Sequence, residues 1–188
     1  VVTAYNKNAA GISVLTDTAY FGGDLDDLIQ TKVLTDIPVL RKDFIIDKWQ
    51  IAEAKAFGAD VILLIAACLS PGDIKEFADY AGSIGLESIL EIHSEKELGH
   101  ICTEVSMVGV NNRNLKTFEV DIRTSLDLIG RMPSGKPAIA ESGIDSADTM
   151  VTLREAGFRG FLIGEGFMRE EEPGKAFEEF IYGLKPIG

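Results

Sequence analysis

Short apolar runs alternate along the chain with longer stretches in which apolar residues recur at helical spacing. The short runs are continuously apolar, which is typical of parallel strands covered on both faces. The pattern predicts strands over Gly11–Leu15, Val39–Lys42, Val61–Ile65, Ser88–Ile92, Met107–Asn111, Ala138–Glu141 and Phe161–Ile163.

The longer stretches between these runs predict helices. One of them begins with Ser70 followed by Pro71, a capping residue and a proline at the first helical position. The predicted helices are Asp24–Leu34, Lys48–Phe57, Pro71–Ile84, Glu95–Thr103, Ile122–Arg131, Ser146–Ala156 and Gly174–Leu184.

Seven strand–helix units in 188 residues predict one α/β domain over residues 1–188, with no linker or second domain. An open doubly wound sheet and a (β/α)8 TIM barrel both fit. The even unit length and the polar residues that end many different strands favour the barrel. A barrel needs eight strands, and Val1–Ala10 has the pattern of the end of a helix. We therefore expect a barrel whose first strand is missing.

Composition narrows the function classes. A net charge of −12 argues against a nucleic-acid partner, which would need a basic patch, but permits a small anionic substrate. Cys68 and Cys102 have no partners at metal-ligand spacing, so we expect no metal, and unpaired cysteines fit the cytoplasm. No apolar run is long enough to span a membrane, so we expect no membrane association.

Four predicted strands end in polar residues, namely Lys42, Glu91, Asn111 and Glu141. Each shares a strand face with the apolar residue two positions earlier, because side chains alternate along a strand. The carboxyl ends of barrel strands meet at one mouth, where barrel enzymes place their chemistry. A lysine beside two glutamates predicts proton transfer near neutral pH. The alternative is that each residue has simply reached solvent. His93 follows Glu91 by two, and a turn role is favoured for it over a catalytic one.

Two glycine-bearing segments follow the last two predicted strands, Glu141-Ser-Gly-Ile144 and Ile163-Gly-Glu-Gly-Phe-Met168. Barrel enzymes frequently bind phosphate with backbone N–H groups of these loops. If phosphate binds there, the carboxylate of Glu165 must point away from it. The polar loop after Asn111 contains Arg113, which fits a carboxylate ligand or plain solvation equally well. Tyr20-Phe-Gly-Gly23 and Phe44 supply aromatic surface or core packing.

Together these segments resemble indole-3-glycerol phosphate synthase of tryptophan biosynthesis. The matching segments run in family order across nearly the whole chain: Ile12-Ser-Val-Leu-Thr-Asp17, Tyr20-Phe-Gly-Gly23, Pro38-Val-Leu-Arg-Lys-Asp-Phe44, Leu90-Glu-Ile-His93, Gly109-Val-Asn-Asn-Arg-Asn-Leu-Lys-Thr-Phe118, Ala140-Glu-Ser-Gly-Ile144 and Leu162-Ile-Gly-Glu165.

The resemblance implies a lyase that closes an indole ring from 1-(2-carboxyphenylamino)-1-deoxyribulose 5-phosphate, releasing carbon dioxide and water without a metal or organic cofactor. It implies that Lys42 is the general acid, that Glu91 is its acid/base partner, and that Asn111 and Glu141 line the reacting centre. The implied substrate contacts are Phe44, Arg113 and Leu115, and the implied phosphate contacts are Ser142, Gly143, Gly164 and Glu165 through its backbone.

The resemblance also has a gap. Nothing in Val1–Asn8 matches the family's first strand, which carries a second active-site lysine. One alternative is therefore a catalytically impaired fragment or scaffold, which would associate through the open edge of the barrel. Another is a related phosphate-binding barrel enzyme such as phosphoribosylanthranilate isomerase, although the Lys-Asp-Phe and Asn-Asn-Arg-Asn-Leu segments argue against it.

Overall fold

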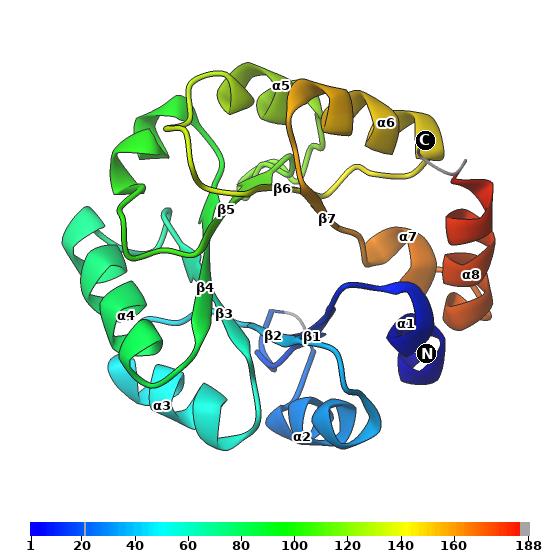
Figure 1. The fold of residues 1–188 in the computed structure, drawn as a ribbon, viewed down its shortest axis with the longest axis horizontal. Coiled ribbons are helices and arrows are strands. Elements are labelled where there is room, and N and C mark those ends of the chain that lie inside the picture. Colours follow the sequence, from blue (N-terminus) through cyan, green and yellow to red (C-terminus); the bar gives the residue numbers. More distant parts are fainter. Residues whose placement is uncertain (21, 185–188) are drawn as a thin grey trace.

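The computed structural model describes residues 1–20 and 22–184, which form a parallel sheet with helices around its outside (Figure 1). The strands are β1 (Ile12–Leu15), β2 (Val39–Lys42), β3 (Val61–Ile65), β4 (Glu87–Ile92), β5 (Met107–Asn111), β6 (Ala138–Glu141) and β7 (Gly160–Leu162). The helices are α1 (Val2–Asn8), α2 (Leu25–Leu34), α3 (Lys48–Ala56), α4 (Pro71–Ser83), α5 (Arg123–Ile129), α6 (Ala147–Ala156), α7 (Glu165–Met168) and α8 (Pro173–Gly183), with a 3₁₀ helix over Glu95–His100.

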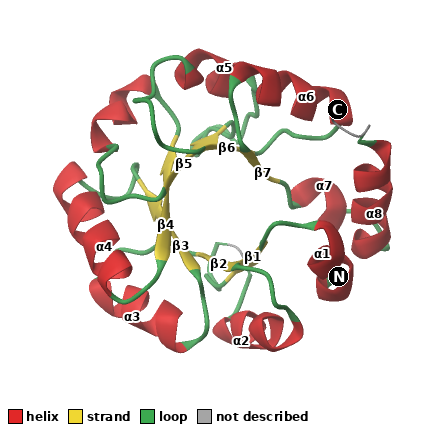
Figure 2. Cartoon of the chain, viewed as in Figure 1, coloured by secondary structure: helices red, strands yellow, loops and turns green. Residues whose placement is uncertain are grey.

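The seven strands pair in sequence order, from β1 to β7. The sheet curls around a central axis, and α1, α7 and α8 lie on the side between β7 and β1 (Figure 2). Within the described residues β1 and β7 are the two edges of the sheet, so the predicted count of seven barrel strands is confirmed. None of the described helices has the length and apolar character needed to cross a bilayer.

The apolar strands are covered on both faces, as their sequence pattern predicts. A large cluster lies between the sheet and the outer helices and includes Ile62, Leu64 and Phe158, which are fully buried. A smaller cluster fills the inside of the curled sheet and consists of Leu40, Val61, Leu63, Ile65 and Ile89. The inner cluster forms the floor on which the polar strand ends rest.

The terminal helices pack against each other through aromatic rings. Tyr5 of α1 contacts Phe177 of α8 at 4.7 Å between ring centroids, and Phe167 of α7 lies 5.5 Å from Phe177. Edge-to-face contacts of this kind add to the area they bury. The beginning and end of the described chain are thereby held together.

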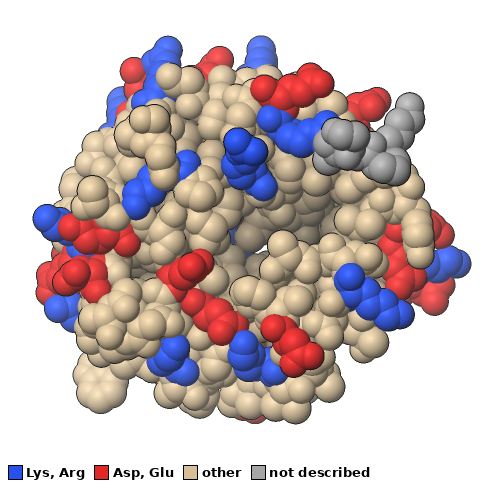
Figure 3. Space-filling view, in the orientation of Figure 1, with Lys and Arg blue, Asp and Glu red and all other residues tan. Residues whose placement is uncertain are grey.

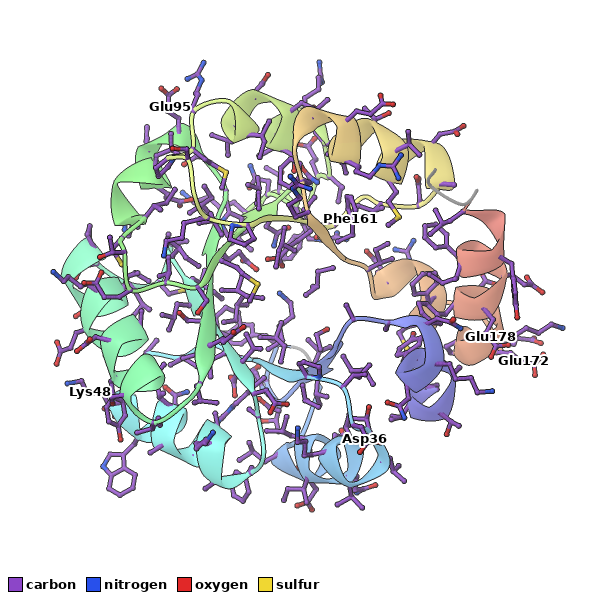
Figure 4. The ribbon with its side chains drawn as sticks, viewed as in Figure 1. Asp36, Lys48, Glu95, Phe161, Glu172 and Glu178 are labelled. Carbon is purple, nitrogen blue, oxygen red and sulfur yellow. The ribbon has the colours of Figure 1, made fainter. Side chains whose placement is uncertain are left out.

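Local sequence signals account for most element boundaries. The Ser70 hydroxyl accepts the Asp73 N–H, and the Asp73 carboxylate accepts the Ser70 N–H, so α4 begins in a reciprocal cap. On the outer rim, Lys48 at the start of α3 pairs with Glu76 of α4 (Figure 4). Most predicted boundaries are correct to within one or two residues.

The predicted helix Glu95–Thr103 is wrong in type and length, because the structure has a 3₁₀ helix that ends at His100. Gly99 disfavours continuation of a helix, and Ile101 is already extended with φ −69° and ψ 117°. The chain turns there toward β5.

Candidate active site

Lys42 reaches from the end of β2 to carboxylates on two other strands. Its Nζ lies 3.2 Å from Glu91 Oε2 of β4 and 3.3 Å from Glu141 Oε2 of β6. The side chains of Glu91 and Glu141 are 2% and 1% exposed, and that of Lys42 is 16% exposed. Buried charges of this kind require partners, and each of the three has at least one.

Strand parity and register bring these groups together. Lys42 shares its strand face with Leu40, and Glu91 shares its face with Ile89, and both apolar residues belong to the inner cluster. Asn111 pairs in register with Glu141, so these two ends lie side by side. The sheet thus assembles the four predicted strand-end residues at one mouth. The space-filling view shows the face of the molecule that carries the helix-to-strand loops, on which charged side chains of both signs surround a central hollow (Figure 3).

Asn111 is held by two donors. The Ser142 hydroxyl donates to Asn111 Oδ1 at 2.8 Å, and the Arg113 backbone N–H donates to the same oxygen at 3.0 Å. Ser142 has φ 64°, a left-handed conformation that costs a non-glycine residue energy and is frequent at functional sites. The amide group of Asn111 also helps to lower the pKa of Glu91.

The two glutamates differ in proton affinity. Burial raises the pKa of Glu91, but contact with His93 and the charge of Lys42 outweigh burial and lower that pKa to about 2. Burial raises the pKa of Glu141 to about 7; the charge of Lys42 opposes this rise and that of Glu91 adds to it. Burial lowers the pKa of Lys42, and the charges of Glu141 and Glu91 overcome this effect and raise it.

At neutral pH the site therefore contains a protonated lysine, an ionised Glu91 and a Glu141 close to half protonation. Two carboxyl groups whose pKa values are pushed apart mark separate acid and base roles. One mobile proton near pH 7 gives the site the capacity for general acid–base catalysis.

A glycine in β5 makes room for Glu141. A Cβ atom at Gly109 would lie 2.2 Å from Glu141 Oε1 and 3.2 Å from Ile89 Cγ2. That carboxylate oxygen is buried and has no hydrogen-bond donor among the described residues, which agrees with the raised pKa of Glu141. The sequence alone places Gly109 beside Asn111 but does not indicate why glycine is needed there.

Sequence reasoning missed the residues on the outer face of β2. Arg41 is buried, and its guanidinium donates to Asp43 Oδ2 at 2.9 Å and to the Gln50 carbonyl at 2.9 Å. The hydroxyl of Thr16, after β1, donates to the same Asp43 oxygen at 2.7 Å. This network joins β1, β2 and α3. Two of its members, Arg41 and Asp43, are the residues directly before and after Lys42. The signal was present as two further charged residues next to Lys42 in an apolar run.

Asn112 was also missed as a structural residue. Its side chain is buried, donates to the Ser142 carbonyl at 3.0 Å and accepts the Ser125 N–H at 3.0 Å. It therefore joins the loop after β5 to the loop after β6 and to α5.

The structure places Arg113 against Glu165. The Arg113 guanidinium pairs with the Glu165 carboxylate and donates to the Phe118 carbonyl, and Arg169 pairs with the second oxygen of Glu165. Glu165 thus faces two arginines. Leu115, further along the same loop, is 41% exposed.

The remaining predicted residues lie on loops at the carboxyl ends of the strands. Gly143 follows Ser142 after β6, and Gly164 caps α7 after β7. The ring of Phe44, after β2, lies 5.4 Å from that of Tyr20 between centroids. Phe21, in the predicted aromatic segment Tyr20–Gly23, lies outside the described residues.

A family model described as indole-3-glycerol phosphate synthase matches residues 1–180. The chain belongs to the indole-3-glycerol phosphate synthase family. It is 46% identical over 177 residues to the protein of that name from Bacteroides thetaiotaomicron, and the match covers 94% of this chain and 68% of the relative.

Other members of the indole-3-glycerol phosphate synthase family give the same picture. The protein of that name from Variovorax paradoxus is 46% identical over 170 residues, and the match covers 90% of this chain and 64% of the relative. The protein of that name from Exiguobacterium sp. is 49% identical over 178 residues, and the match covers 93% of this chain and 70% of the relative. The chain thus spans about two thirds of the length of these relatives.

Among solved structures, the tryptophan synthase α-subunit from Pyrococcus furiosus has a TM-score of 0.74 with 15% sequence identity. The match covers 97% of this chain and 89% of that subunit. At this identity the likeness shows the fold alone.

The contact between Gly109 and Glu141 predicts the effect of adding one methyl group. Gly109→Ala is expected to displace the Glu141 carboxylate and lower the free energy of unfolding by about 1–3 kcal/mol, as overpacking does. Gly82→Ala in α4 is the matched control, because its Cβ would meet open space and helical alanine is favoured over glycine. Urea unfolding measures both, and equal stability of the two variants would contradict the close contact.

The raised pKa of Glu141 predicts a pH-dependent stability. The pKa of Glu141 is raised from 4.5 to about 7 in the folded state. The contribution of this carboxyl group to the free energy of unfolding is therefore complete below pH 4.5 and is lost as the pH rises through about 7. Glu141→Gln removes this loss. The free energy of unfolding of the variant, relative to that of the wild type, should therefore rise by on the order of 3 kcal/mol between about pH 4.5 and pH 8. Chemical unfolding across this range measures the difference. The exposed Glu179→Gln serves as control, and a constant difference for Glu141→Gln would refute the assignment.

Proposed function

We propose that this chain carries the active site for the indole-forming reaction of its family. The substrate is 1-(2-carboxyphenylamino)-1-deoxyribulose 5-phosphate, which loses carbon dioxide and water as the indole ring closes. The observation that carries the proposal is Lys42 between Glu91 and Glu141 at the carboxyl ends of three strands, where barrel enzymes place catalytic residues. The family membership of the chain supports it independently.

The protonation states suit distinct roles. Lys42 is protonated at neutral pH because its pKa is raised, so its Nζ is a proton donor for the substrate carbonyl oxygen during ring closure. Glu91 is ionised because its pKa is lowered, so it is the base that accepts the proton released by the substrate nitrogen in the dehydration, and the departing hydroxyl group takes a proton from Lys42 to leave as water. Glu141, with a pKa of about 7, lies 3.3 Å from Lys42 and exchanges a proton with it.

The loops supply the remaining binding groups of the proposal. Ser142, Gly143 and Gly164 offer backbone N–H groups to the substrate phosphate, and Glu165 does so through its backbone. Phe44 and Leu115 offer apolar contacts to the aromatic ring. The carboxylate of the substrate binds Arg113 by replacing Glu165, because the same guanidinium is engaged by Glu165 in the structure.

The role of Lys42 leads to a kinetic prediction. In the protein as its gene encodes it, Lys42→Met keeps the aliphatic length but cannot donate a proton, so kcat should fall at least about 100-fold with a much smaller change in KM. Growth of indole fluorescence measures turnover. Lys175→Met on the exposed face of α8 is the matched control. An unchanged kcat in Lys42→Met would remove Lys42 from the proposed chemistry.

The two sheet edges support a second proposal, that copies of this chain associate. We infer that β1 and β7 pair with strands of other copies, because parallel edges expose unpaired N–H and C=O groups. The 188-residue chain should therefore elute as an oligomer in size-exclusion chromatography with light scattering. Ser13→Pro in β1 removes an N–H donor of the open edge, because the alternate residues Ile12 and Thr16 direct their N–H groups toward Pro38 and Lys42, and it should shift the population toward monomer. A chain that is monomeric at all concentrations would refute this proposal and leave the enzymatic one intact.

A further inference from the structure

His93 lies immediately after β4, at the start of the turn into the 3₁₀ helix. Its side chain is only 12% exposed, and both ring nitrogens are shielded from solvent. A buried imidazole needs groups nearby that account for its ring nitrogens. Among the described residues, the two groups that form ion-pair contacts with its ring nitrogens are both carboxylates.

The imidazole lies between Glu91 and Glu97. Its Nε2 is 3.1 Å from Glu91 Oε1, and its Nδ1 is 3.7 Å from Glu97 Oε2. Neither contact is aligned as a hydrogen bond, so the attraction is that of an ion pair when the ring is protonated. The ring therefore bridges a catalytic-site carboxylate and a carboxylate of the turn.

Glu97 is fixed in place by the backbone of the turn. Its Oε2 accepts the His93 N–H at 2.5 Å and the Ser94 N–H at 3.2 Å. A carboxylate that caps two backbone N–H groups has little freedom to move. The imidazole is thus anchored on the side away from the site.

Glu91 in turn has a basic side chain facing each oxygen. Oε2 faces Lys42 Nζ at 3.2 Å, and Oε1 faces His93 Nε2 at 3.1 Å. Because the Glu91 side chain is only 2% exposed, it depends on these two basic side chains rather than on bulk solvent. The orientation of the carboxylate depends on both contacts.

We propose that His93 is a positioning residue that holds Glu91 Oε1, so that Oε2 faces Lys42 and the carboxylate stays ionised. This inference rests on the proposed catalytic role of Glu91. It adds a residue that acts through Glu91 and touches neither the substrate nor Lys42. The turn role that the sequence favours for His93 is compatible with the positioning role, because the backbone of His93 lies in the turn while its ring contacts Glu91.

The charges around the imidazole support a protonated ring. Burial lowers the pKa of His93, whereas contact with Glu91 and the charges of Glu97 and Glu141 raise it, and the net direction is upward. The titratable groups that face the pair come from several elements: Glu91 of β4, Glu97 of the 3₁₀ helix, Glu141 of β6, Lys42 of β2 and, near Glu91, Cys68 after β3.

The first test does not depend on activity. The chain has two histidines, so the NMR titration of their rings yields two curves, and His100→Gln assigns them. Glu91→Gln should lower the pKa of His93 by about one unit or more, and the second histidine signal serves as the reference. Glu97→Gln should lower it by less, because that contact is longer. An unchanged His93 pKa in folded Glu91→Gln would overturn the pairing.

The second test reads the effect on catalysis in the protein as its gene encodes it. His93→Gln retains an N–H donor but not the charge, so kcat should fall about tenfold with KM changed less than about twofold. The acidic limb of the pH profile of kcat should move to higher pH by about one unit, because Glu91 is protonated more easily. His100→Gln is the matched control.

The outcomes distinguish a failure of the positioning role of His93 from a failure of the catalytic role of Glu91. Loss of thermal stability in His93→Gln without a shift of the pH profile would show a structural residue and overturn the positioning role. Full activity in Glu91→Gln would overturn the proposed role of Glu91 and with it the positioning role, even where the NMR titration confirms the ion pair.

Discussion

The ion cluster of Lys42 with Glu91 and Glu141 is the interaction on which the site depends. The single charge of Lys42 cannot neutralise two buried carboxylates, so one carboxyl group gains proton affinity and its pKa rises toward neutral pH. The surroundings decide which one does. Glu91 has a second basic neighbour in His93, whereas Glu141 has a buried oxygen with no donor among the described residues, and its pKa is raised to about 7. The arrangement thus stores a transferable proton beside a protonated amine.

The scaffold is adapted to this cluster on both faces of the sheet. Inside, Gly109 leaves the volume that the Glu141 carboxylate occupies. Outside, Arg41 and Asp43 form a buried pair that ties β2 to α3, and so the residues on either side of Lys42 are fixed. A charged side chain held by rigid strands is positioned more accurately than one on a loop. The binding residues proposed for the substrate lie on loops, where the Arg113–Glu165 pair leaves room for exchange with an anionic ligand.

The fold and the chemistry are separable in this molecule. The tryptophan synthase α-subunit has a similar fold at 15% identity, so the barrel architecture alone does not select a reaction. The family match rests instead on the whole sequence over residues 1–180. This match agrees with the lysine–glutamate cluster at the carboxyl ends of the strands. Enzymes that share the barrel fold differ from one another mainly in the residues at these strand ends.

Strand positions, parity and order along the chain follow from the sequence, because alternation along a strand and continuous apolar runs are local properties. Lys42, Glu91, Asn111 and Glu141 could therefore be assigned to one mouth in advance. The type of the Glu95–His100 helix was missed although its causes are local, namely capping of the His93 and Ser94 N–H groups by Glu97 and the presence of Gly99. The unequal proton affinities of the two glutamates, the need for glycine at 109 and the bridge from His93 to Glu91 depend on distances between separate strands and loops. Burial and Coulomb interaction act through space, so only the tertiary structure decides them.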